Sequence, residues 1–212
     1  MRAIAKTFVS AILAGACIAL GGTVFLSLES NVLGALFFTV GLFTICMFGL
    51  NLFTGKVCYL FQRDRAYARN LPVIWLGNLA GAILIGLLVR AARIGPSLVE
   101  RARGVCAAKL SDGWLSLFLL GILCNIFIYI AVEGFNQSPH QVGKYLSLFF
   151  GVMVFILCGY EHCVADMFYF TAAGVWSVDT VLRLIVITLG NAVGGVLFPL
   201  VRTWLAKPDA TG

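Results

Sequence analysis

Three ionisable side chains lie close together in a strongly apolar part of the chain. Glu161, His162 and Asp166 fall within the stretch GYEHCVADMFYF, residues 159–170. Histidine titrates near neutral pH and can donate a hydrogen bond or a proton to the anion of a weak acid. An ionisable group in a membrane span costs on the order of 3 kcal/mol or more, so it indicates a functional site. We expect His162 to face a substrate, and Glu161 and Asp166 to support the surrounding backbone.

The composition is that of a protein embedded in lipid. Of 212 residues, 61% are hydrophobic and 11% are charged, whereas soluble domains carry about 25% charged residues. The net charge of +6 comes mostly from residues between apolar runs, which is typical of membrane-protein loops and gives no indication of a nucleic-acid partner. The seven cysteines are scattered and the two histidines are far apart. The sequence therefore predicts no disulfide, no metal site and no cofactor.

Six apolar segments follow one another along the chain. Each is long enough to cross about 30 Å of hydrocarbon as a helix. The first begins after Arg2 and Lys6 and resembles a signal peptide, but its apolar run continues for about 20 residues, so we expect a transmembrane helix. The connectors are too short to hold a soluble domain, which predicts one transmembrane domain over residues 1–212. The six segments are approximately 8–28, 31–61, 71–90, 113–132, 145–172 and 180–204.

The second and fifth segments are longer than one span and contain polar interruptions, NLFTGK (51–56) and GYEHCVADM (159–167). The patterns GNLAGA (77–82) and GNAVGG (190–195) lie 113 residues apart, and the interruptions have nearly the same offset. We therefore predict two three-helix repeats, approximately 1–90 and 110–207, each with a broken middle helix. Because three is odd, the second repeat is inverted in the membrane. Such repeats place a transport site between them.

Charge favours a cytoplasmic N-terminus by a small margin. In that orientation eight basic residues, Lys207 among them, lie in inner segments and six lie in outer ones. The basic connector 90–113 is on the outer side and opposes this assignment. It either concentrates anions at the outer mouth or is a solvated loop with an atypical charge bias.

Other polar residues in the apolar segments have less specific patterns. The hydroxyl of Thr54 is placed to reach the same cavity as His162. Asn191 either contacts the pore or makes an interhelical hydrogen bond, and the glycines around it and Asn78 permit close helix packing. Lys109 precedes the fourth segment, where an interfacial lysine is ordinary.

GYEHCVADMFYF resembles the signature G-[FY]-E-H-[SC]-[VI]-A-N-M-[FY] of the formate/nitrite transporter family. NLFTGK is similar to that family's E-L-F-T loop, TLGNAVGG (188–195) to its T-x-G-N-x-x-G-G segment, and GILCN (121–125) to its fourth helix. The resemblance implies an all-α membrane protein with six helices, the second and fifth broken, and an aquaporin-like protomer. It also implies a homopentamer in which each protomer has its own pore.

The resemblance assigns roles to particular residues. His162 matches the central pore histidine, Thr54 the threonine facing it, and Asn191 the pore asparagine of the last helix. Lys109, sixteen residues before Asn125, matches the lysine that attracts anions. Two apolar constrictions are implied, one formed by Phe38, Leu42, Leu52 and Phe53 and the other by Ile128 and Phe155.

The implied function is a channel or transporter, not an enzyme, for small monovalent anions of weak acids such as formate, nitrite or hydrosulfide. Apolar constrictions exclude hydrated ions, and His162 donates a hydrogen bond or a proton to the anion between them. The protein would be a multi-pass component of a prokaryotic inner or plasma membrane, with both termini cytoplasmic. Its partners would be the anions, protons and the lipid bilayer.

Three positions depart from the family pattern. Asn51 stands where Glu is frequent, Asp166 where Asn is usual, and Lys56 follows the LFTG turn. We predict an ion pair between Asp166 and Lys56 across the two interruptions, with Glu161 helping to hold the second one.

Two alternatives of other classes stay open. A membrane redox subunit would need paired histidines or a metal cluster. A channel for ammonia, or another neutral or cationic solute, would favour an aromatic cage and paired pore histidines.

Overall fold

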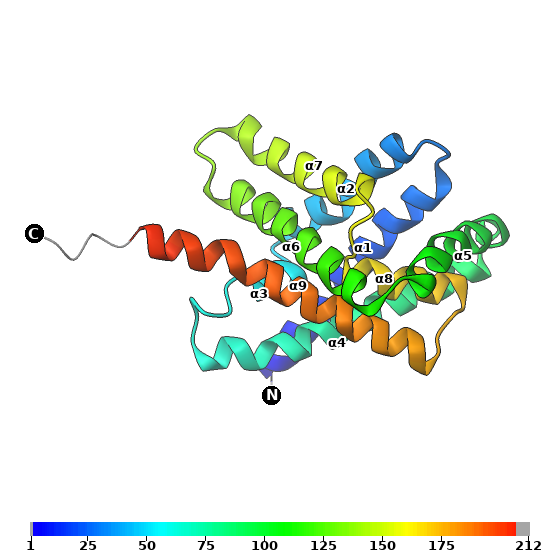
Figure 1. The fold of residues 1–212 in the computed structure, drawn as a ribbon, viewed down its shortest axis with the longest axis horizontal. Coiled ribbons are helices and arrows are strands. Elements are labelled where there is room, and N and C mark those ends of the chain that lie inside the picture. Colours follow the sequence, from blue (N-terminus) through cyan, green and yellow to red (C-terminus); the bar gives the residue numbers. More distant parts are fainter. Residues whose placement is uncertain (1, 207–212) are drawn as a thin grey trace, which may run out of the picture.

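The computed structural model describes residues 2–206, and every regular element in that range is a helix (Figure 1). Lys207, and with it the end of the predicted second repeat, lies outside the described residues. The helices are α1 (Arg2–Ser27), α2 (Asn31–Phe48), α3 (Phe53–Val57), α4 (Arg65–Ala91), α5 (Gly95–Ser111), α6 (Trp114–Gln137), α7 (Gln141–Leu157), α8 (Cys163–Ala173) and α9 (Val178–Leu205).

Five of these helices, α1, α2, α4, α6 and α9, are long and apolar enough to cross a membrane. Helices α7 and α8 are shorter but also apolar. Large hydrophobic side chains remain exposed along most of them, as expected where the solvent is lipid tails. The prediction of an all-helical, multi-pass membrane protein is therefore confirmed.

The long second and fifth apolar segments are each divided between two helices. Helix α2 ends at Gly49 (φ 64°), and α7 is followed by Gly159 (φ 68°), both in the left-handed region that glycine adopts at low cost. The amide of Leu50 donates to the carbonyl of Ile45, and the amide of Tyr160 donates to that of Phe155, each at 2.9 Å. Both helices thus end with the same hydrogen-bond pattern, in which a left-handed glycine closes the last turn.

The interruptions, residues 49–52 and 158–162, lie somewhat earlier in the chain than the sequence predicts. The quoted polar stretches begin near each interruption, but Lys56 and Asp166 already belong to the short helices α3 and α8. Each short helix starts directly after one extended residue, Leu52 before α3 and His162 before α8.

Glycines bring α4 against α1 and α9 against α6. A Cβ atom on Gly81 would lie 2.0 Å from the carbonyl oxygen of Ile12, and one on Gly194 would lie 2.1 Å from that of Ile122. Both contacts are with backbone, which cannot move aside without shifting a helix. The packing role expected for the glycines of the two GN-x-x-G patterns agrees with this geometry.

The turns between helices lie at two opposite ends of the molecule. The turns 58–64 and 138–140 lie near the C-terminal end of α9, at the left in Figure 1. Helix α5 lies at the opposite end, together with the turns 28–30 and 174–177. We call these the α3 end and the α5 end.

The basic connector 90–113 is mostly helix α5, which the sequence analysis did not predict. Arg90 donates to the carbonyl of Ala172 at 2.9 Å, and Arg103 donates to that of Ala173 at 3.3 Å. These carbonyls end α8, where the helix dipole favours positive charge. The basic residues of the connector therefore cap α8, a reason for their presence that neither sequence interpretation anticipated.

Candidate functional site

The centre of the site is a hydrogen bond between Thr54 of α3 and His162, the residue before α8. The Thr54 Oγ1 and His162 Nε2 atoms are 3.0 Å apart, and both side chains are almost fully buried. His162 Nδ1 accepts from the amide of Ala165 at 3.1 Å. Because Nδ1 is an acceptor, the proton of the neutral ring is on Nε2, which donates to Thr54. The structure brings together the two residues that sequence reasoning placed in one cavity.

The first interruption is held by Asn78 of α4. Its Nδ2 donates to the carbonyls of Ala11 and Asn51, at 2.8 and 2.9 Å, and its Oδ1 accepts from the amide of Phe53 at 2.8 Å. One buried amide thus satisfies backbone groups on both sides of the interruption, which would otherwise cost free energy in an apolar setting.

Asn191 of α9 holds the second interruption in the same way. Its Nδ2 donates to the carbonyls of Gly121 and Glu161, each at 2.8 Å, and its Oδ1 accepts from the amide of Cys163 at 2.9 Å. Of the two roles left open by the sequence, the structure shows the interhelical hydrogen bond. Both amide hydrogens are used, so none is left to donate to a substrate.

Asn125 of α6 joins the two halves, and sequence reasoning gave it no role. Its Nδ2 donates to the carbonyl of Thr54 at 3.1 Å, so it fixes the backbone that carries the Thr54 hydroxyl. The only available signal was a buried amide in an apolar helix, within the GILCN match.

A cavity of about 250 Å³ reaches His162 from the α5 end. Phe38 and Phe155 line it with their rings edge to face, 6.2 Å between centroids. Phe155 also stacks on the imidazole of His162 at 5.6 Å and 20°. The approach to the histidine from this end is therefore aromatic and narrow.

Lys109 of α5 lines this cavity beside two carboxylates. Its Nζ forms ion pairs with Glu161 and with Asp166, the latter at 2.9 Å. Burial alone would lower the pKa of Lys109, but Asp166 and Glu161 raise it above its ordinary value, so the ammonium stays charged. One cation and two carboxylates give this cavity a formal charge of −1.

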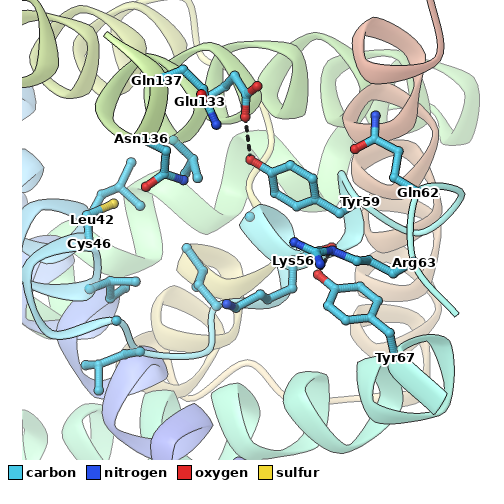
Figure 2. A pocket seen from close by; sticks show the side chains of 16 residues that line it. Leu42, Cys46, Lys56, Tyr59, Gln62, Arg63, Tyr67, Glu133, Asn136 and Gln137 are labelled. Atoms are coloured by element: carbon cyan, nitrogen blue, oxygen red, sulfur yellow. Dashed lines mark hydrogen bonds between the residues drawn. The ribbon is translucent and has the colours of Figure 1, made fainter. Parts of the chain in front are cut away.

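A larger cavity, about 570 Å³, opens at the α3 end (Figure 2). Leu42 and Leu52 line its inner part, and Lys56 and Arg63 contribute positive charge. Further out, Tyr59 donates to Glu133 at 2.7 Å, the hydrogen bond drawn in Figure 2.

Three residues expected at the constrictions have the following places in the structure. Phe38 lines the same cavity as Phe155, not a constriction with Leu42 and Leu52. Phe53 lines an apolar groove between α4 and α9. Buried Ile128 is not among the side chains that line either cavity.

The predicted ion pair between Lys56 and Asp166 is also wrong. Asp166 pairs with Lys109 at the α5 end, whereas Lys56 lines the α3-end cavity. Each of α3 and α8 runs from the middle of the molecule toward a different end, so their side chains diverge.

The structure thus has two cavities at opposite ends and a buried polar pair, Thr54 and His162, of which His162 lines the cavity at the α5 end. Within residues 2–206 no cluster of three His, Cys, Asp or Glu residues is placed to hold a metal ion. The polar groups at the centre offer hydrogen bonds instead.

Comparison with known proteins gives a consistent result. A family model described as formate/nitrite transporter matches residues 1–205. The chain is 37% identical over 190 residues to formate-nitrite transporter 2 of Toxoplasma gondii, covering 80% of this chain but only 40% of that relative. It is 27% identical over 237 residues to the formate channel FocA of Haemophilus influenzae, covering 90% and 83%. A solved pentameric formate channel with formate bound matches with a TM-score of 0.82 at 26% identity, over 96% of this chain and 97% of that one.

Proposed function

Because this chain belongs to the formate/nitrite transporter family, we propose that it is a membrane channel for small monovalent anions of weak acids, formate and nitrite first, with hydrosulfide as a further candidate. The observation that carries the proposal is the buried Thr54–His162 pair between two cavities that open at opposite ends. Formate and nitrite are small enough to pass such a constriction and can each accept a hydrogen bond.

The centre would stabilise an anion through hydrogen bonds. The amide of Ala165 fixes the proton of His162 on Nε2, which faces Thr54. An anion entering between them would accept hydrogen bonds from Nε2 and from the Thr54 hydroxyl. A bare anion in an apolar passage costs several kcal/mol, and these donors offset part of that cost. A proton that travels with the anion would remove the charge altogether.

The apolar walls would form two constrictions, one on each side of the histidine. Phe38 and Phe155 form the one toward the α5 end, and Leu42 with Leu52 forms the one toward the α3 end. Hydrophobic constrictions of this kind exclude hydrated ions and continuous water chains.

We assign six membrane spans to this architecture, arranged as two inverted repeats. In this assignment α2 with α3, and α7 with α8, each form one broken span. The matching hydrogen bonds of Asn78 and Asn191, 113 residues apart, support the repeat. The N-terminus, at the α3 end, is assigned to the cytoplasm. We also assign a homopentamer with one pore per protomer, and the likeness to a solved pentameric formate channel supports the pentamer.

Flux into proteoliposomes tests the function. Formate, nitrite, hydrosulfide, chloride and ammonium are compared at several pH values for the parent protein, His162→Ala and Thr54→Val. Each variant is first shown to give the parent's oligomer by size-exclusion chromatography. We expect selective flux of weak-acid anions that rises as the pH falls, and its loss in His162→Ala. Equal ammonium flux, or no anion flux from intact oligomer, would overturn the proposal.

A further inference from the structure

The two helix interruptions are equivalent position by position, with an offset of 110 residues. Gly49 matches Gly159, and the extended residue Leu52 matches His162. By the same offset Lys56 of α3 corresponds to Asp166 of α8. Equivalent positions at the two ends of the pore therefore carry opposite charges.

The same contrast appears five residues earlier, within the interruptions. Asn51 corresponds to Glu161, so the first interruption lacks the carboxylate that the second one has. The backbone carbonyl of Asn51 accepts a hydrogen bond from Asn78, and that of Glu161 accepts one from Asn191. We call the hydrogen bonds of Asn78 the first clamp and those of Asn191 the second clamp. Together the two pairs of positions make the first interruption more positive by three unit charges.

Two cations, Lys56 and Arg63, line the α3-end cavity. Neither Lys56 nor Arg63 takes part in an ion pair among residues 2–206. Glu133 is the one carboxylate among the residues that line this cavity, and it pairs with Arg202 at 2.7 Å and accepts from Tyr59. The Lys56 side chain, half-buried, extends into the cavity in Figure 2.

The cation at the α5 end is in the opposite situation. Lys109 is only 12% exposed, and two carboxylates contact its ammonium. The formal charges of the side chains that line the α5-end cavity therefore sum to −1.

We propose that the α3-end cavity is the anion-capturing mouth of this pore, where Lys56 and Arg63 bind a small monovalent anion, and that Asp166 suppresses capture at the other mouth. This rests on the proposed function, because the bound anion is the transported one. The cavity is far larger than formate, so the anion there keeps much of its hydration and the site concentrates it without holding it tightly.

The expected size of the effect follows from Coulomb's law. One unit charge across about 5 Å of water changes the local concentration of a monovalent anion roughly fourfold. The effect is largest in about 10 mM salt and nearly vanishes in about 1 M salt, where charges are screened beyond about 3 Å. Removal of Lys56 should therefore raise the half-saturating formate concentration about fourfold in low salt.

The test needs a defined orientation. Proteoliposomes with an N-terminal affinity tag are captured through the tag, which selects vesicles whose α3 end faces outward. Formate influx then starts at the α3 end and efflux starts at the α5 end. The variants are Lys56→Gln, Arg63→Gln and Asp166→Asn. The control is Arg65→Gln, which removes the same charge two residues from Arg63, at an exposed position that does not line the cavity.

In low salt we expect Lys56→Gln and Arg63→Gln to raise the half-saturating concentration for influx about fourfold, with little change in efflux. Arg65→Gln should match the parent. Asp166→Asn should lower the half-saturating concentration for efflux by a similar factor. All differences should disappear in about 1 M salt.

Equal influx constants in parent and Lys56→Gln would overturn the inference while leaving the channel function intact. An equal change in Arg65→Gln would also overturn it, because a general surface potential would then be responsible. Absence of formate flux in the parent itself is a different result, which sinks the proposed function.

Discussion

The two helix interruptions share one backbone and differ in side chains. Both end a helix on a left-handed glycine, both continue through one extended residue, and both are held by an asparagine that bonds three backbone groups. At the first, the extended residue is Leu52, whose side chain makes no capping hydrogen bond. At the second it is His162, which accepts from Ala165. The two interruptions thus share one backbone geometry, and only the second has a histidine at the extended position.

The largest expected difference is between Lys109, which pairs with side chains at the second interruption, and Lys56, which follows the first. Lys109→Met would leave Glu161 and Asp166 buried without a cation, which costs about 3–5 kcal/mol. Lys56→Met removes a lysine that has no ion-pair partner among the described residues, so the stability should hardly change. Thermal unfolding of both variants in detergent measures the difference. Similar melting temperatures would show that the Lys109 cluster does not stabilise the fold.

The two clamping asparagines should behave alike. Asn78→Ala and Asn191→Ala each leave three buried backbone groups without a partner, and we expect each to lose about 3 kcal/mol of stability or to fail to assemble. Asn136→Ala, at an exposed position of the α3-end cavity, is the matched control. Oligomer yield and unfolding temperature are the readouts. A large effect in only one of the two variants would break the equivalence of the repeats.

The contact between the repeats should matter more for flux than for stability. Thr54→Val removes the acceptor of the His162 Nε2–H group and costs about 1 kcal/mol of stability. Formate flux should fall at least about tenfold, because both donors to the anion are disturbed. Thr54→Ser keeps the hydroxyl and should keep most of the flux. If Thr54→Val had the same formate flux as the parent, the Thr54 hydroxyl would not be a hydrogen-bond donor to the transported anion.

The smallest expected effect concerns pH. The carboxylates raise the pKa of Lys109 above its ordinary 10.5. A raised lysine pKa contributes stability that is fully present below 10.5 and is lost only as the pH rises beyond it. The unfolding temperature of the parent should thus show no loss from Lys109 between about pH 6 and pH 9, and the loss should appear only above that range. A loss within that range would mean that the carboxylates do not hold the Lys109 ammonium in its charged form.

Several features of the fold could be predicted because they depend on properties that are local in the sequence, namely the length of the apolar segments and the spacing of the glycines. Sequence patterns identified the apolar segments, the two interrupted stretches and the pair formed by His162 and Thr54. They did not predict helix α5, because its composition is that of a polar connector and its contacts with α8 are tertiary.

Partner choice among charged groups was the main failure. Asp166 was assigned to Lys56 because both depart from one family pattern, but the structure pairs it with Lys109, 57 residues away. Helices α3 and α8 extend from the middle of the molecule toward opposite ends, and this determines which charged side chains can meet. No sequence pattern encodes the direction of either helix. The role of Asn191 was uncertain for the same reason, since a buried amide in a helix has many neighbours.

The first clamp also bears on how the protein is made. Every atom that Asn78 bonds, on Ala11, Asn51 and Phe53, precedes it in the chain. The first half therefore contains all the hydrogen-bond partners for its own interruption before the ribosome has synthesised α6. The second clamp is equally self-contained, between Gly121 and Asn191. Each half thus contains every hydrogen-bond partner that its own clamp needs, whereas the Thr54–His162 contact and the Asn125 hydrogen bond need both halves.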